Sequence, residues 1–274
     1  MRQNGCATAV WSVSLLRHFE NQHGFHQYPG SLPIFVKYCD LTLRSAEENL
    51  ACDEALLDFC QSGGCDGVLR FWEPNNYFVA LGYANRAATE VNLEFCRSQT
   101  IPVLRRCTGG GTVLQGPGCL NYSLILKCDV SPSLQSITGT NEFVLKRHQE
   151  ILSTLLRAPV EKRGHTDLAI GGLKFSGNAQ RRRQKFLLFH GSFMLHLDIS
   201  LIEKALPFPS RQPDYRTDRS HSDFLMNLKI SSHLLKTALR GAWAASDTLV
   251  ELPFEAIAKL IEQKYGCDEW NLKF

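Results

Sequence analysis

The chain lacks several features that would fix its class at once. No run of apolar residues approaches the ~20 needed to span a bilayer, which argues against a membrane protein. Its ten cysteines never occur in the CxxC spacing of zinc sites. Neither sign of charge dominates, because 30 Lys and Arg stand against 27 Asp and Glu, so the composition does not indicate a nucleic-acid partner. There is no internal repeat. A length of 274 residues with 44% hydrophobic content suits one large α+β domain with a packed core.

The cysteines and the N-terminal segment bear on where the protein resides. We interpret the cysteines as reduced, mostly buried thiols of an intracellular protein, in the cytoplasm or in an organelle matrix. Residues 1–33 contain a single acid, Glu20, together with Arg2, Arg17 and several His. This composition leaves two interpretations open, a targeting segment or a loose N-terminal extension. We therefore expect the catalytic domain to occupy residues 34–274.

The most informative segment of the chain is residues 105–111, with the sequence RRCTGGG. Glycines allow backbone N–H groups to approach a ligand closely, and Arg105 or Arg106 supplies a permanent positive charge. This combination favours an anionic ligand such as a carboxylate or a phosphate. The alternative is an ordinary glycine-rich turn with solvated arginines. No Lys-Ser/Thr pair follows Gly109, Gly110 and Gly111, so a Walker-type phosphate loop is disfavoured.

A second segment, residues 165–180, has the pattern of a β-hairpin. Gly171 and Gly172 form a two-residue turn signal between β-prone runs, and Lys174 falls just after the turn. Taken alone, a lysine at this position is an ordinary solvated strand residue. A further apolar run carries His190-Gly191-Ser192.

In this order, the motifs resemble the lipoate-protein ligase family of the biotinyl and lipoyl protein ligase superfamily. The residues that carry the resemblance are RRCTGGG at 105–111, Asn121-Tyr122-Ser123, Asp167-Leu168, KFSGNA at 174–179 and His190-Gly191. The similarity runs from about Tyr38 to the C-terminus. It implies an α+β fold with mixed, mainly antiparallel sheets flanked by helices, as in class II biotin synthetases and lipoate ligases.

The resemblance also implies the roles of individual residues. Lys174 is the predicted catalytic residue, which would contact the activated acyl group and the phosphate of an acyl-adenylate. Asp167 would orient the nucleotide or a metal ion, and its alternative is a solvated turn acid. His190 has two interpretations, a ligand contact or a structural hydrogen bond to the backbone. The predicted substrate-binding and nucleotide-binding residues are Arg105, Gly109, Gly110, Gly111, Asn121, Asp167, Ser176, Gly177, His190 and Gly191.

The reaction implied by the family is ATP-dependent activation of lipoate, with Mg²⁺ accompanying the ATP. The lipoyl group then passes to a lysine of a lipoyl domain in a 2-oxoacid dehydrogenase or of a glycine cleavage H protein. Related octanoyl- and lipoyl-transferases use a cysteine thiolate instead, and residues 157–168 and 174–190 contain no cysteine. Cys107 and Cys119 lie near the glycine loop but do not match the known nucleophile positions.

Three alternatives to a complete ligase remain open. Because the chain ends at Phe274, soon after the Trp270-Asn271 segment, we expect a separate polypeptide to supply an accessory domain, or the protein only to transfer a preformed acyl group. The third alternative is a catalytically inert acyl-binding module. The resemblance is also imperfect at Gln115, where many family members carry a histidine.

Hydrophobic periodicity predicts the secondary structure. Ser45 and Glu48 form a capping box that opens a helix through Cys60. We expect residues 68–72 and 77–81 to form a strand pair, and Arg181-Arg182-Arg183 to be a solvated hairpin tip and not a nucleic-acid patch. Further strands are predicted at 34–41, before Arg105, at 120–126, on both sides of Gly171-Gly172 and at 186–195. Further helices are predicted around Leu93 and Phe95, and at 140–156, 199–206, 230–242 and 254–265.

Overall fold

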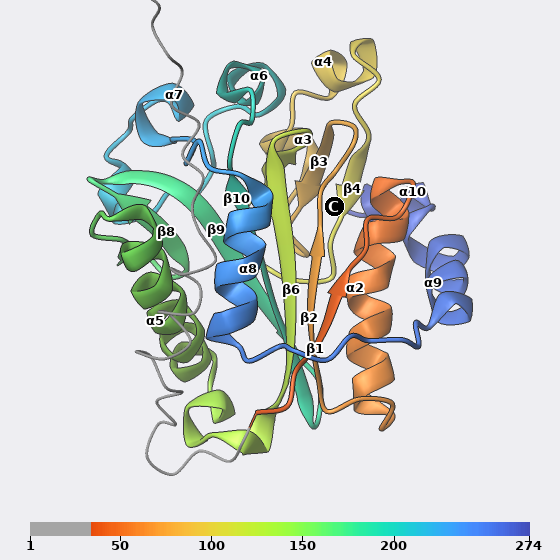
Figure 1. The fold of residues 1–274 in the computed structure, drawn as a ribbon. Coiled ribbons are helices and arrows are strands. Elements are labelled where there is room, and N and C mark those ends of the chain that lie inside the picture. Colours follow the sequence, from red (N-terminus) through yellow and green to blue (C-terminus); the bar gives the residue numbers. More distant parts are fainter. Residues whose placement is uncertain (1–33) are drawn as a thin grey trace, which may run out of the picture.

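A seven-stranded sheet forms the centre of the protein in a computed structural model that describes residues 34–274 (Figure 1). The predicted N-terminal extension, residues 1–33, lies outside the described residues. The strand order is β1-β2-β6-β10-β9-β8-β7, and every neighbouring pair is antiparallel except β1 and β2. These strands are β1 (Lys37–Asp40), β2 (Gly67–Trp72), β6 (Cys119–Lys127), β7 (Glu161–Arg163), β8 (Asp167–Ile170), β9 (Leu173–Arg182) and β10 (Phe186–Met194).

A smaller sheet of three strands packs beside the main one. Its order is β4-β3-β5, with β3 parallel to β4 and antiparallel to β5. The strands are β3 (Phe78–Leu81), β4 (Val103–Arg105) and β5 (Val113–Gln115). The glycine triplet lies between β4 and β5, so this sheet positions the glycine loop.

Helices cover both faces of the main sheet. The α-helices are α2 (Ala46–Gln61), α3 (Ala87–Glu90), α4 (Leu93–Ser98), α5 (Ile137–Leu156), α6 (Ile199–Ala205), α7 (His221–Phe224), α8 (Ser232–Ala242), α9 (Phe254–Leu260) and α10 (Asp268–Asn271). The 3₁₀ turns are η1 (Cys128–Val130), η2 (Pro132–Gln135) and η3 (Asp214–Arg216), and η4 (Ile261–Tyr265) is a π-helix. Figure 1 shows α5 and α8 on one side of the sheet and α2 with α9 on the other.

The alternation of side chains along the strands creates these two cores. On β6, Leu120, Tyr122 and Leu124 pack with residues of α5 and α8, whereas Ile125 packs with residues of α2 and α9. Successive residues of a strand point to opposite faces, so a strand between two helical layers must be apolar on both. This explains why β6 is buried along almost its whole length.

The helix α2 begins where the capping box predicts. The Ser45 backbone N–H donates to Glu48 Oε2 at 2.8 Å, and the Glu48 N–H donates to Ser45 Oγ at 3.2 Å. The predicted hairpin is also confirmed, because β8 and β9 flank Gly171 and Gly172, whose φ angles are 56° and 78°. Both angles lie in the left-handed region that this turn requires and that glycine adopts without strain.

Two structural predictions are wrong. Strands β2 and β3 do not pair with each other, since β2 lies between β1 and β6 while β3 belongs to the smaller sheet. The arginines at 181–183 are not simply solvated. Arg181 donates to the Cys107 carbonyl at 2.9 Å, Arg182 to the Thr140 hydroxyl at 3.1 Å, and Arg183 to Asp58 at 2.8 Å. They tie the β9–β10 hairpin to neighbouring elements.

The cysteines of the described residues are all free, and most are buried, as predicted. Cys65 and Cys267 are the partly exposed members of this set. Within residues 34–274, no helix is long and apolar enough to cross a membrane.

Candidate active site

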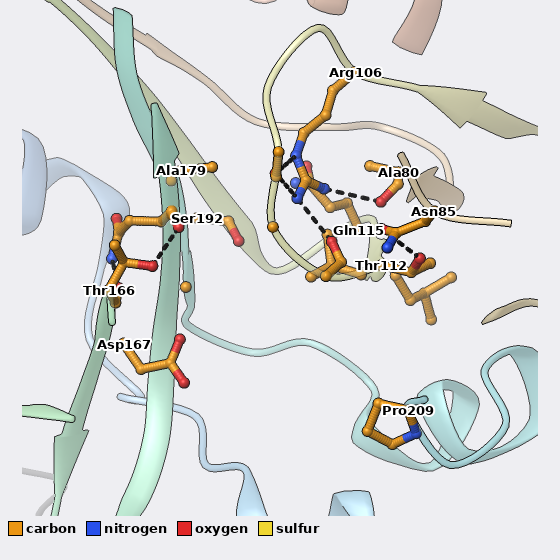
Figure 2. Close-up of a pocket in the computed structure, with 18 of the residues that line it drawn as sticks. Ala80, Asn85, Arg106, Thr112, Gln115, Thr166, Asp167, Ala179, Ser192 and Pro209 are labelled. Carbon is orange, nitrogen blue, oxygen red and sulfur yellow. Dashed lines mark hydrogen bonds between the residues drawn. The ribbon is translucent and has the colours of Figure 1, made fainter. Parts of the chain in front are cut away.

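A large cavity lies between the main sheet and the glycine loop of the smaller sheet. Its volume is about 1590 Å³, compared with the 300–1,000 Å³ that is usual for small-molecule sites. Figure 2 shows Arg106 and Thr112 on one side and Thr166, Asp167 and Ser192 across from them. A cavity of this size can hold a ligand with two parts, for example an acyl chain and a nucleotide.

Strand register builds one wall of the cavity. Asn121 on β6 lies opposite both Trp72 on β2 and Ser192 on β10, and Ser192 lies opposite Gly177 on β9. All four residues line the cavity. The amide Nδ2 of Asn121 and the indole Nε1 of Trp72 are buried without a hydrogen-bond partner among the described residues. Buried donors are normally paired, so these two unpaired groups in residues that line the cavity mark this part of the wall as a candidate ligand contact.

Lys174 stands at the edge of this wall in a short polar chain. Its Nζ lies 2.8 Å from Asp167 Oδ1, and the Tyr215 hydroxyl donates to Asp167 Oδ2 at 2.9 Å. Burial, together with the Asp167 carboxylate, raises the pKa of Tyr215, so its proton stays on the phenol. One carboxylate oxygen of Asp167 therefore pairs with the Lys174 ammonium, and the other accepts a hydrogen bond from Tyr215 in η3.

Gly177 leaves the space that Lys174 occupies. A Cβ at this position would lie 3.0 Å from Lys174 Nζ and 3.1 Å from its Cε. Lys174 is on the same strand three residues earlier, so the Lys-x-x-Gly spacing of the motif has a steric reason. Gly191 also lines the cavity, on the neighbouring strand β10.

The glycine loop folds around Arg106. Arg106 donates to the carbonyl oxygens of Gly109 and Gly111 from NH2 at 2.6 and 2.7 Å, and to the Ala80 carbonyl from NH1 at 3.0 Å. Its Nε donates to Thr108 Oγ1 at 3.0 Å. Because the guanidinium is buried, its pKa falls to about 10, with no carboxylate in an ion pair with it among the described residues. Such an uncompensated charge favours an anion nearby.

Arg105, which the sequence analysis placed in the binding site, lies outside the cavity wall. It is fully buried and donates from NH1 to the carbonyl oxygens of Gly82, Tyr83 and Asn85. Its Nε donates to the Trp270 carbonyl at 3.1 Å. Alternation along β4 turns this side chain away from the cavity, toward α10, which Figure 1 shows beside β4. Arg105 thus holds the 82–85 loop, and the adjacent Arg106 faces the cavity.

His190 is held from both ring nitrogens. Its Nε2 lies 2.7 Å from Thr108 Oγ1, and its Nδ1 lies 3.3 Å from Asp53 Oδ2. Asp53 also forms a buried ion pair with Arg70 at 2.6 Å. Burial alone would raise the pKa of Asp53, but Arg70 and His190 together hold it below its ordinary value. Asp53 is therefore a carboxylate at neutral pH.

The remaining predicted residues fall into two groups. Gly109, Gly110, Gly111, Asn121, Asp167, Gly177, His190 and Gly191 all line the cavity together with Lys174. Ser176 is buried behind the wall, where its hydroxyl accepts a 3.4 Å hydrogen bond from Asn178. No group of three His, Cys, Asp or Glu in residues 34–274 could hold a metal ion. The part of the chain described here therefore does not form a metal cage around Asp167.

Cys107 and Cys119 both line the cavity as neutral thiols. Burial raises the pKa of each to about 12, and Glu54 adds to the effect at Cys107. About one thiol in 10⁵ is then ionised at pH 7. Arg181 and Lys264 oppose the shift at Cys107 but do not outweigh burial, and neither thiol is in the partly exposed surroundings that activate a nucleophilic cysteine.

Sequence reasoning missed Asp53, Arg70, Thr108 and Tyr215. Two of them left a signal. Asp53 and the adjacent Glu54 place carboxylates between apolar residues of α2, and Arg70 places a charge inside the buried strand β2. Charged residues at such positions need partners. Tyr215 lies in the three-residue 3₁₀ turn η3, which is too short to leave a periodic pattern.

The comparisons with known proteins agree with this arrangement. The model of the lipoyl protein ligase A/B catalytic domain family matches residues 45–234, and the chain belongs to this family. Octanoyltransferase LipM of Lysinibacillus sphaericus is 29% identical over 82% of this chain and 94% of its own length. Lipoate-protein ligase A subunit 1 of Thermoplasma acidophilum is 27% identical over 82% of this chain and 91% of its own.

Solved structures show the same fold. The structure described as a bipartite lipoate protein ligase and its E2 lipoyl domain from Thermoplasma acidophilum has a TM-score of 0.73 at 24% identity, covering 87% of this chain and 96% of that one. A lipoate-protein ligase A bound with ATP has a TM-score of 0.71 at 23% identity, covering 88% and 99%. The predicted α+β class, with antiparallel-dominated sheets, is confirmed.

Proposed function

We propose that this protein transfers a lipoyl or octanoyl group to the ε-amine of a lysine in a lipoyl-domain protein, and that the acyl donor in its cavity is an acyl-adenylate. The observation that carries the proposal is the contrast within the cavity wall. Lys174 and Arg106 supply positive charge, whereas Cys107 and Cys119 are buried neutral thiols. The wall suits an anionic donor better than an acyl-cysteine.

The charges suit a phosphate group. Arg106 binds the carbonyl oxygens of Gly109 and Gly111. With these carbonyls directed toward Arg106, the amide N–H groups of the loop can bind a phosphate. Lys174 lies across the cavity on β9, where its ammonium can reach the same group. Six cationic side chains against four acidic ones line the cavity, namely Arg86, Arg106, Lys174, Arg181, Arg211 and Arg216 against Asp53, Glu90, Asp167 and Asp214.

The chemistry then follows from charge stabilisation. The acceptor lysine, as the free amine, attacks the carbonyl carbon of the mixed anhydride, and AMP leaves with the bonding electron pair. Negative charge grows first on the carbonyl oxygen and then on the departing phosphate. Lys174 is positioned to stabilise this charge, and Asp167 keeps its ammonium in place. The attacking nitrogen loses a proton to water as the amide forms, so the products are the acylated lysine, AMP and a proton.

Activation of lipoate by ATP on the same chain is a second candidate, which the ligase relative favours. In that case Mg²⁺ would enter bound to the ATP phosphates, since the described residues form no metal cage. The bipartite ligase among the structural neighbours is the reason to include a separate accessory polypeptide in the tests.

The test offers the purified protein different acyl donors together with a lipoyl domain. Preformed lipoyl- or octanoyl-adenylate should acylate the acceptor lysine, as detected by intact mass, without any hydroxylamine-sensitive adduct on the enzyme. A covalent acyl-cysteine formed from an acyl-carrier donor would support the cysteine-transferase mechanism of this superfamily instead. Pyrophosphate release with ATP and lipoate, with and without an accessory subunit, tests the second candidate.

A further inference from the structure

We propose that a buried chain of four side chains, Arg70, Asp53, His190 and Thr108, fixes the tautomer of His190 and thereby positions Arg106 and the glycine loop. His190 and Thr108 are then positioning residues, and Asp53 orients His190. This inference deepens the proposed function and rests on it, because the glycine loop is taken to bind the phosphate of the acyl donor.

For a neutral imidazole, the contacts allow one consistent placement of the protons. Arg70 can only donate and the Asp53 carboxylate can only accept, so Nδ1 of His190 must donate to Asp53 Oδ2 across 3.3 Å. A neutral imidazole then has a lone pair on Nε2, which accepts from the Thr108 hydroxyl across 2.7 Å. With its hydrogen directed to His190, the Thr108 oxygen is left to accept from Arg106 Nε at 3.0 Å.

The chain ends in the glycine loop. Besides Thr108, Arg106 binds the carbonyls of Gly109, Gly111 and Ala80, so four of its five N–H groups go to acceptors in this protein. The Thr108 oxygen is the one side-chain acceptor that Arg106 has among the described residues. Without it, Nε of Arg106 would keep only the 3.2 Å hydrogen bond to the Gly109 carbonyl, so the guanidinium and the loop carbonyls that it binds would be held less tightly.

A positioning role fits better than a role as general base. The ring of His190 is already engaged at both nitrogens, and Nε2 faces Thr108. Arg70, Asp53 and Thr108 are buried and the side chain of His190 is 11% exposed, so water competes little for the buried bonds of this chain.

The first experiment measures the tautomer directly in the unliganded protein. Uniformly ¹⁵N-labelled protein should show the ring of His190 with a proton on Nδ1 and none on Nε2, and the resonances can be assigned by difference with His190→Gln. This result depends on the chain alone and not on any activity. A proton on Nε2 would overturn the inference, because Nε2 could then no longer accept from Thr108.

The second experiment measures ligand binding in matched threonine variants. The probe is a sulfamate analogue of octanoyl-adenylate, titrated by calorimetry. Thr108→Val removes the hydroxyl at constant shape and should weaken binding about tenfold, since it leaves buried hydrogen-bonding groups unpaired. Thr108→Ser restores the hydroxyl and should recover most of the affinity. Thr154→Val is the control, because within residues 34–274 the Thr154 hydroxyl bonds only to the Glu150 carbonyl, on the exposed side of α5.

The outcomes separate this inference from the proposed function. If the wild type does not bind the analogue, the proposed function fails, whatever the tautomer. If the wild type binds and Thr108→Val binds equally well, the positioning role fails while the function stands. An equal loss in Thr108→Val and Thr108→Ser would also count against it, because packing and not the hydroxyl would then be responsible.

Discussion

Replacement of Lys174 by methionine is the sharpest test of the proposed chemistry. Methionine keeps most of the volume and removes the ammonium, which lies 2.8 Å from Asp167. If this charge stabilises the transition state of acyl transfer, its loss should cost about 3–4 kcal/mol, or about 10²–10³ in rate. Lys174→Arg should recover only part of the rate, since a planar guanidinium cannot occupy the same position.

The fold should survive this substitution. The side chains of Lys174 and Asp167 are both partly accessible, at 21% and 12%, and Asp167 keeps the hydrogen bond from Tyr215. We therefore expect a loss of about 1–2 kcal/mol in the free energy of unfolding. Urea unfolding of the variant measures this quantity separately from activity.

The assay is a single turnover with preformed lipoyl-adenylate and a lipoyl domain, followed by intact mass. Lys236→Met is the matched control, because Lys236 also forms ion pairs, with Asp40 at 2.9 Å and with Glu73 at 2.7 Å, but lies away from the cavity. The control should keep its transfer rate. A Lys174→Met enzyme that transfers within a few fold of the wild type would remove Lys174 from the mechanism.

Three further predictions concern the cavity and the core. Cys107→Ala and Cys119→Ala should each keep most of the transfer activity, and loss of an acyl adduct together with activity in either would indicate a thioester route. Gly177→Ala should slow transfer several-fold with little change in melting temperature, because the new Cβ meets the flexible end of Lys174, whereas Gly241→Ala has open space around it in α8, away from the cavity, and serves as the control. Burial lowers the pKa of His148 to about 3, with Arg147 adding to the effect, so between pH 6.5 and pH 5 the unfolded chain takes up a proton that the folded protein does not. The free energy of unfolding should therefore fall by roughly 2 kcal/mol over that interval in urea titrations, and His148→Gln should lack this part of the pH dependence.

Local signals in the sequence predicted most elements of secondary structure. The capping box of Ser45 and Glu48 begins α2 because it satisfies free N–H groups at the helix end. This signal lies within four consecutive residues, so it can be identified from the sequence. The turn at Gly171-Gly172 is likewise local, since it depends on backbone angles that glycine adopts freely. The prediction that β2 pairs with β3 failed because strand partners are chosen by packing over the whole sheet.

The tertiary structure decided which residues share the cavity. Arg105 and Arg106 are adjacent and chemically identical, and only alternation along β4 and the docking of α10 turn the first into a support for the 82–85 loop and the second toward the cavity. Asp53 and His190 are far apart in sequence and meet because α2 packs on β10. The motifs by themselves determined the fold class and the family, since these depend on local patterns in a fixed order. The hydrogen-bond partners of Lys174 and His190 could not be predicted from the sequence, because long-range hydrogen bonds leave no periodic pattern in it.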